Sequence, residues 1–214
     1  ITESVGLVSG VLILPQRQTA LVAKQAAQVD VLSNGRLRLG VGVGWNPVEY
    51  SALGQDWKTR GNRQSEQIEL MNKLWTERSV NFRGAFDTVE HAGVNPLPVQ
   101  RPIPVWFGGG SDATLKRAAR LGSGWIPLGN PGTKTTLMIE KLNKFLILEG
   151  REKEKFGIEA WIRYGDGNPE SWALTAEKWL TLGANHLTFY TSGQGAGSVS
   201  QQIESMSKFK QILS

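Results

Sequence analysis

The sequence predicts an α/β fold in which helices cover a mostly parallel sheet. Along the 214 residues, six apolar, strand-like segments alternate with six segments of helical periodicity. The first strand-helix-strand unit has the length that a parallel crossover needs. None of the glycine clusters has the GxGxxG spacing expected after the first strand of an open dinucleotide-binding sheet. The pattern therefore favours part of a closed barrel, which would need two more strand-helix units to reach eight.

Each element follows from its apolar spacing and from the turn residues that end it. The expected strands are residues 5–14, 37–45, 103–107, 124–128, 156–164 and 186–191. The expected helices are residues 19–32, 59–76, 112–121, 133–148, 169–182 and 198–213. Ser33-Asn34-Gly35, Gly150 and Gly183 supply the residues that commonly end helices. Residues 45–57 show no such period and are expected to form a loop.

One segment interrupts the alternation. Short alternating pieces at residues 80–82 and 86–89, separated by Arg83-Gly84-Ala85, predict a hairpin, within an insertion at about residues 78–101. An insertion of this size is either an edge hairpin or a lid that could close over a site. Residues 1–214 are otherwise expected to form a single domain. Because the chain opens at Ile1 and runs at once into a strand pattern, we expect an N-terminal piece to be absent from it.

The composition excludes several classes of site. Zero cysteines exclude disulfides and thiolate metal sites, and two histidines, His91 and His186, exclude a histidine-rich one, so no metal is expected. Neither histidine has an obvious serine partner for a catalytic triad. The net charge is +5, but the basic residues are scattered, so neither a nucleic-acid nor a membrane partner is expected. The absence of a long apolar run or a signal-peptide pattern predicts a cytoplasmic protein.

Glycines occupy one whole face of the expected strand LRLGVGVGW, residues 37–45. Gly40, Gly42 and Gly44 lie on that face, opposite the apolar residues. Glycine is tolerated in a strand where a ligand or a second backbone comes close. The face is therefore either the floor of a cofactor pocket or a crowded barrel interior. Trp45 and Asn46 follow at the carboxyl end of the strand, where they could form a wall beside a flat ring, unless the tryptophan plugs the barrel.

The strongest local signal is Gly108-Gly109-Gly110-Ser111, between a buried strand and a helix. Unobstructed backbone N–H groups at a helix N-terminus bind anions, and the hydroxyl of Ser111 adds a donor. This pattern predicts a phosphate site; the alternative is that Ser111 or Asp112 only caps the helix. A second irregularity is Ser9-Gly10, which interrupts the first apolar run and indicates a bulge or the close approach of a ligand.

Several stretches together resemble the bacterial luciferase-like superfamily, and most nearly its F420-dependent oxidoreductase branch. They are VLSNGRLRLGVGVGWNPVEYSALG (31–54), RGNRQSEQIELMNKLW (60–75), NPLPVQRPIPVWFGGGS (95–111) and GWIPL (124–128). The resemblance implies a TIM (β/α)8 barrel whose first two units are missing from this chain. It also implies a homodimer that transfers a hydride between the deazaflavin F420 and a small organic substrate. An FMN-dependent monooxygenase of the same superfamily and a non-catalytic flavin- or F420-binding relative are the alternatives.

The resemblance also assigns cofactor-binding residues, in three groups. The first is a bulge whose non-prolyl cis peptide, Gly10–Val11, presses on the middle of the ring: Ser9, Gly10 and Val11. The second is the ring-facing end of the next strand: Gly42, Val43, Gly44, Trp45 and Asn46. The third is the phosphate-binding turn: Gly109, Gly110 and Ser111. The acid and base residues of the family usually come from the first two strands, so the catalytic proton donor is left unknown.

Overall fold

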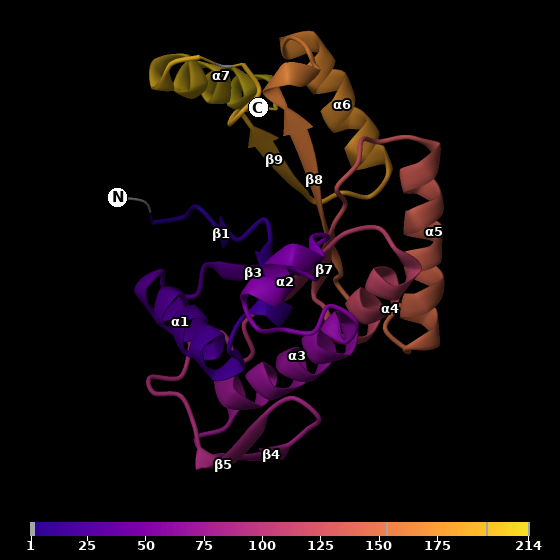
Figure 1. The fold of residues 1–214 in the computed structure, drawn as a ribbon. Coiled ribbons are helices and arrows are strands. Elements are labelled where there is room, and N and C mark those ends of the chain that lie inside the picture. Colours follow the sequence, from indigo (N-terminus) through magenta and orange to yellow (C-terminus); the bar gives the residue numbers. More distant parts are fainter. Residues whose placement is uncertain (1–2, 153, 196, 214) are drawn as a thin grey trace.

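A curved parallel sheet organises the computed structural model, which describes residues 3–152, 154–195 and 197–213 (Figure 1). Its strands are β1 (Leu7–Val8), β2 (Leu12–Ile13), β3 (Leu37–Gly42), β6 (Val105–Gly108), β7 (Gly124–Ile126), β8 (Gly157–Arg163) and β9 (His186–Tyr190). Their order is β1-β3-β6-β7-β8-β9, with β2 also paired to β3, and every pairing is parallel. Strands that follow the chain order in this way are typical of a β/α barrel.

Helices cover the outer, convex side of this sheet (Figure 1). They are α1 (Thr19–Leu32), α2 (Pro47–Ala52), α3 (Arg60–Thr76), α4 (Asp112–Leu121), α5 (Thr133–Leu148), α6 (Pro169–Thr181) and α7 (Val199–Ile212). Two short 3-10 helices, Leu14–Gln16 and Tyr164–Asp166, follow β2 and β8. Within the described residues no pairing joins β9 to β1, so the sheet forms an open arc of a barrel. Within the same ranges, the helices are too short or too polar to cross a membrane.

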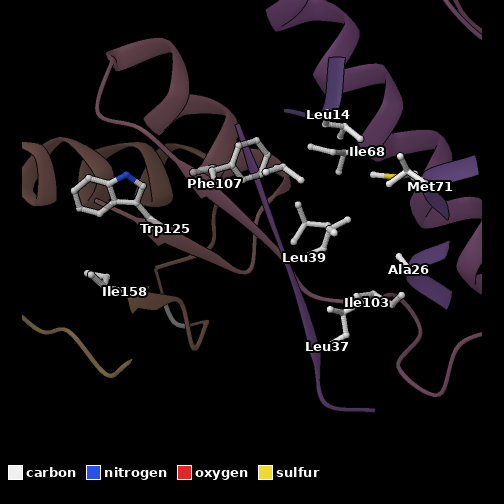
Figure 2. Close-up of a cluster of buried hydrophobic side chains, with 14 of the residues drawn as sticks. Leu14, Ala26, Leu37, Leu39, Ile68, Met71, Ile103, Phe107, Trp125 and Ile158 are labelled. Atoms are coloured by element: carbon white, nitrogen blue, oxygen red, sulfur yellow. The ribbon is translucent and has the colours of Figure 1, made fainter. Parts of the chain in front are cut away.

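The hydrophobic core lies between the sheet and the helices. In Figure 2, Leu37 and Leu39 of β3 face Ala26 of α1 and Ile68 and Met71 of α3. All five side chains are buried, and full burial of a leucine, isoleucine or methionine side chain contributes about 1.5 to 3 kcal/mol. The apolar face of β3 therefore packs against the helices. The glycine face turns toward the concave interior of the arc.

The prediction of a loop at residues 45–57 is wrong in part, because this segment contains α2. Asn46 caps this helix, since its side chain accepts a hydrogen bond from the N–H of Val48 at 3.1 Å. Pro47 occupies the first helical position, which suits its fixed φ. Six residues are too few to display a helical period. The Asn46 cap and the Pro47 that follows it can, however, be recognised in the sequence. The first expected strand is also divided, because residues 9–11 separate β1 from β2.

The expected hairpin is present, but its second strand begins later than predicted. Strand β4 (Val80–Arg83) pairs antiparallel with β5 (Thr88–Ala92). The Glu66 carboxylate of α3 accepts the N–H groups of Ala85, Phe86 and Asp87 at 2.7 to 2.8 Å, which holds residues 84–87 as the turn. The Thr19 hydroxyl at the start of α1 donates to Asp87 at 2.8 Å. These contacts fix the tip of the hairpin against α1 and α3, and closure of the hairpin over a site stays a prediction.

Candidate cofactor site

A bulge between β1 and β2 lies at the centre of the candidate site. The Gly10–Val11 peptide bond is cis, as the resemblance implies, and the Ser9 hydroxyl donates to the Gly40 carbonyl at 2.9 Å. The side chain of Val11 fills space that two glycines leave open. A Cβ atom at Gly42 would lie 2.8 Å from Val11 Cγ2, and one at Gly108 would lie 2.8 Å from Val11 Cγ1. The glycines of β3 and β6 therefore seat the bulge.

The glycine face of β3 is a crowded interior rather than an open floor, so the first of the two interpretations is corrected. At Gly40 a Cβ atom would lie 1.8 Å from the Ser9 carbonyl oxygen, and at Gly44 it would lie 3.0 Å from Ile13 Cγ2. Backbone and side chains of the bulge segment thus cover this face. The surface turned to the interior is that of the bulge itself, where Gly10 is exposed.

Two aromatic residues of the interior were missed by the sequence analysis. Trp161 of β8 and Tyr190 of β9 stack, with ring centroids 5.9 Å apart and planes 26° apart. A Cβ atom at Gly10 would lie 3.0 Å from Trp161 Cζ2, so the bulge and this pair meet across the arc. The alternation of Glu159, Trp161 and Arg163 along one face of a buried strand was the signal that could have identified them.

A polar cluster lies in the same interior, nearer the amino ends of the strands. Arg38 of β3 forms an ion pair with Glu159 of β8 at 3.2 Å, and the Thr188 hydroxyl of β9 donates to Glu159 at 2.6 Å. His186 packs edge-on against Trp106, with ring centroids 5.0 Å apart. Burial, followed by the charge of Arg38, lowers the pKa of His186, while Glu159 opposes that shift. Neutral His186 is therefore favoured, in a role that joins strands.

The predicted wall after β3 is present only in part. Trp45 is 83% exposed, so it does not plug the barrel. Both ends of the Asn46 carboxamide are engaged by α2, because Oδ1 accepts from Val48 and Nδ2 donates to Glu49 Oε1 at 3.1 Å. The Val43 carbonyl accepts from the Tyr50 hydroxyl at 2.6 Å, and burial raises the pKa of Tyr50 to about 12. The polar groups of Asn46 and Val43 thus serve the start of α2.

The turn after β6 combines the two alternatives raised for it. Ser111 does cap α4, since its Oγ accepts from the Thr114 N–H at 3.2 Å and lies 2.9 Å from the Thr114 hydroxyl. Gly109 has a φ of +115°, a conformation that side-chain-bearing residues rarely adopt. A Cβ atom at Gly110 would lie 2.6 Å from Met138 Sδ. The cap therefore positions a bare backbone turn at the start of α4, against α5.

A pocket of about 430 Å³ opens beside this turn. Its walls come from the ends of β6 and β7 and from the first turns of α4 and α5: Gly110, Ser111, Leu128, Gly129, Asn130, Lys134, Thr135 and Met138. Lys134 supplies positive charge, and Asn130 accepts from Arg163 Nη1 at 2.9 Å. The Lys134 ammonium group and the N–H groups at the α4 N-terminus suit a phosphate group. Lys134 was not predicted, because it belongs to the next strand-helix unit.

Within the described residues, no group of three or more histidine, aspartate or glutamate side chains is arranged to hold a metal ion. The site thus consists of the bulge, the Trp161–Tyr190 pair and the pocket beside the β6 turn. The bulge lies between β1 and β2, and the other two predicted groups lie at the carboxyl ends of β3 and β6. Asn46 bonds within α2, and the β3 glycines are covered by the bulge segment.

Comparison with known proteins places this geometry in a family. The model of the luciferase-like monooxygenase family matches residues 1–206. The F420-dependent glucose-6-phosphate dehydrogenase of Amycolatopsis mediterranei is 35% identical over 143 residues, which are 65% of this chain and 42% of the relative. The FMNH2-dependent dimethylsulfone monooxygenase of Pseudomonas putida is 29% identical over 180 residues, 82% of this chain and 49% of the relative. The chain spans about half the length of the curated relatives it matches.

Solved structures agree on the fold. A monooxygenase from Streptomyces bottropensis has a TM-score of 0.82 at 19% identity, covering 99% of this chain and 78% of its own. The F420-dependent tetrahydromethanopterin reductase of Methanopyrus kandleri has a TM-score of 0.77 at 15% identity, covering 90% of this chain and 79% of its own. The predicted TIM-barrel fold of luciferase-like type is confirmed. With nearly its whole length matched by the family model, this chain belongs to the luciferase-like monooxygenase family.

Proposed function

We propose that this chain forms the cofactor-binding part of an oxidoreductase that transfers a hydride between F420 and a small organic substrate. The observation that carries the proposal is the arrangement along β6 and the turn after it. Gly108 seats the bulge, and Gly110, two residues later, borders the pocket of about 430 Å³. Two residues of extended chain span about 7 Å, so a surface for a ring and a site for its phosphate lie close together.

Each end of the site has its own task. At the pocket, the backbone of Gly110 and Ser111, the α4 N-terminus and Lys134 would hold the phosphate. At the other end, the Gly10–Val11 bulge would support one face of the ring, and Trp161, which faces Gly10 across the arc, would border the ring. The bound deazaflavin would supply the hydride-donating or hydride-accepting centre. The protein contributes orientation and a partly apolar environment, which excludes water from one face of the ring.

FMN is the second candidate cofactor, because it also combines a flat ring system with a phosphate. A relative that uses FMNH2 supports it, whereas the relative that uses F420 has the higher identity, 35% against 29%. The residues around the pocket suit a phosphate from either molecule. An FMN-dependent monooxygenase is therefore the alternative function, and a relative that binds a cofactor without turning it over is a further one.

Titration of the purified chain with F420 and with FMN, followed by fluorescence, tests the proposal. Binding of F420 at least tenfold tighter than FMN would support it. Binding of FMN without F420 would favour the monooxygenase. A cofactor that binds, but that neither reductant nor organic substrate can reduce, would favour the non-catalytic relative.

A further inference from the structure

The N-terminus of α3, where Thr59 is the N-cap residue, has neither a side-chain cap nor an acidic residue in its first turn. The first N–H groups of a helix lack intrahelical acceptors and carry partial positive charge. This end of the helix therefore favours an anion, and the side chains around it add to that preference.

Two arginine side chains meet at this turn. Arg60 lies over the ring of Trp57, with Cζ 3.6 Å from the ring centroid, and its Nη1 donates to the Trp57 carbonyl at 2.7 Å. The Nε atom of Arg60 is buried and has no hydrogen-bond partner among the described residues. Arg117 approaches from α4, so that its Nη1 would lie 3.0 Å from a Cβ atom at Gly61. The two guanidinium groups thus flank the first turn of α3.

A buried amide beside them is the independent sign of a ligand. Gln64 is 1% exposed, and its Oε1 accepts a hydrogen bond from Arg117 Nε at 3.2 Å. Its Nε2 has no hydrogen-bond partner in the described part of the chain. A buried donor without a partner is unfavourable, and native structures contain few of them. An acceptor bound between the two arginines would satisfy this donor.

The local charge points the same way. Across the described ranges, the ion pairs involve neither Arg60 nor Arg117, whereas Arg120 on the same helix pairs with Glu69 at 3.4 Å. Burial, together with the charges of Arg60 and Arg120, lowers the pKa of Arg117. Two half-buried arginines without a counter-ion repel each other, and an oxyanion would remove that repulsion.

We propose that Arg60, Gln64 and Arg117 bind a phosphate-type oxyanion between the first turn of α3 and α4. Planar guanidinium groups match the oxygen spacing of phosphate and sulfate, and the Gln64 amide adds a donor. This site is distinct from the pocket after β6. Arg117 lies six residues beyond Ser111, about 9 Å along the axis of α4. That pocket is bordered by Thr135 and Met138 of α5, whereas the proposed site faces α3.

Calorimetry with inorganic phosphate, at an ionic strength held constant with sodium chloride, tests the proposal. The measurements use a Gly110→Val background, in which the pocket after β6 is blocked whether or not it serves a cofactor. Phosphate binding should persist in this background and weaken at least about tenfold on adding Arg117→Met, as expected for lost bonds to a charged group. The matched control is Arg120→Met, which should bind phosphate like the background, because Arg120 already has Glu69 as its partner.

Thermal unfolding separates binding from a purely structural role. In phosphate-free buffer, Arg117→Met should unfold somewhat earlier than the wild-type chain, because it removes the hydrogen bond to the buried Gln64 Oε1. The difference should widen in phosphate, because the variant should lose the stabilisation that phosphate gives the wild type. Three results would overturn the proposal: no phosphate binding in the Gly110→Val background, equal binding with and without Arg117→Met, or destabilisation by Arg117→Met that is the same with and without phosphate. A further measurement uses Arg117→Met without the Gly110→Val change. If this single variant no longer bound F420 or FMN, the two arginines would belong to the cofactor site, and a separate site would be refuted.

Discussion

Replacing Gly108 by alanine tests whether glycine seats the bulge. The added methyl group would lie 2.8 Å from Val11 Cγ1 and 3.3 Å from Val11 Cγ2, well inside van der Waals contact. Overpacking of this kind costs about 1 to 3 kcal/mol. Val11→Ala removes both methyl groups; at about 0.8 kcal/mol for each fully buried group, it should cost about 1 kcal/mol here, because Val11 is half-buried.

The double variant should be more stable than the sum of the two losses predicts. In Val11→Ala the remaining Cβ atom lies 3.6 Å from the methyl group that Gly108→Ala adds, an ordinary contact. Urea unfolding of the four proteins should therefore give a coupling free energy of about 1 to 2 kcal/mol. The matched control is Gly6→Ala, where a Cβ atom meets nothing within 4 Å, and its effect should stay within about 0.5 kcal/mol. Additive losses, or an equal loss at Gly6, would refute the seating of the bulge by glycine.

Four further predictions concern the pocket, a buried phenol, the hairpin and the assembly. In Gly110→Val the added Cβ atom would lie 2.6 Å from Met138 Sδ, so the side chain should disturb the pocket. The affinity for F420 or FMN should fall at least about tenfold in a fluorescence titration, and unchanged affinity would count against the phosphate site. Because the folded pKa of Tyr50 is about 12, above its ordinary value of 10, its contribution is complete below pH 10 and is lost as the pH rises from 10 to 12. In urea unfolding across that window, Tyr50→Phe should lose less stability than the wild type, and parallel curves would contradict this. Glu66→Ala removes three charge-assisted hydrogen bonds to the hairpin turn, so the free energy of unfolding should fall by at least about 1.5 kcal/mol. Hydrogen exchange of the turn amides should also become faster, and exchange as slow as in the wild type would show that the turn does not depend on Glu66. Light scattering should give twice the chain mass, as expected for the homodimer that the family resemblance implies, and a monomer would contradict that expectation.

Much of the fold could be predicted because its cause is local. Leu37 and Leu39 alternate with Arg38 and Gly40, which is the pattern of a strand with one apolar face. Such a face packs against helices, so the alternation of strands and helices can be predicted from the sequence. Helix α2 was not predicted, because six residues are too few to show a helical period and only Asn46 and Pro47 mark its start. Local signals thus give the elements and miss the shortest one.

The filling of the site could not be predicted, since it depends on residues distant in the sequence. What covers Gly40 is the carbonyl of Ser9, 31 residues earlier, and what faces Gly10 is Trp161, from the far side of the arc. Lys134 enters the pocket from the following unit. A strand pattern shows that glycine is needed at a position, but only the three-dimensional neighbours show whether backbone, side chain or ligand takes the space.

The ion pair between Arg38 and Glu159 joins two strands, β3 and β8, that are separated in the sheet by β6 and β7. A contact across the hollow of the sheet fixes how tightly its two halves curl toward each other. The same curl brings Trp161 of β8 to the bulge beside β3. An ion pair near the amino ends of the strands therefore helps to set the position of Trp161 against the bulge, and a substitution at Arg38 should change the surroundings of Gly10.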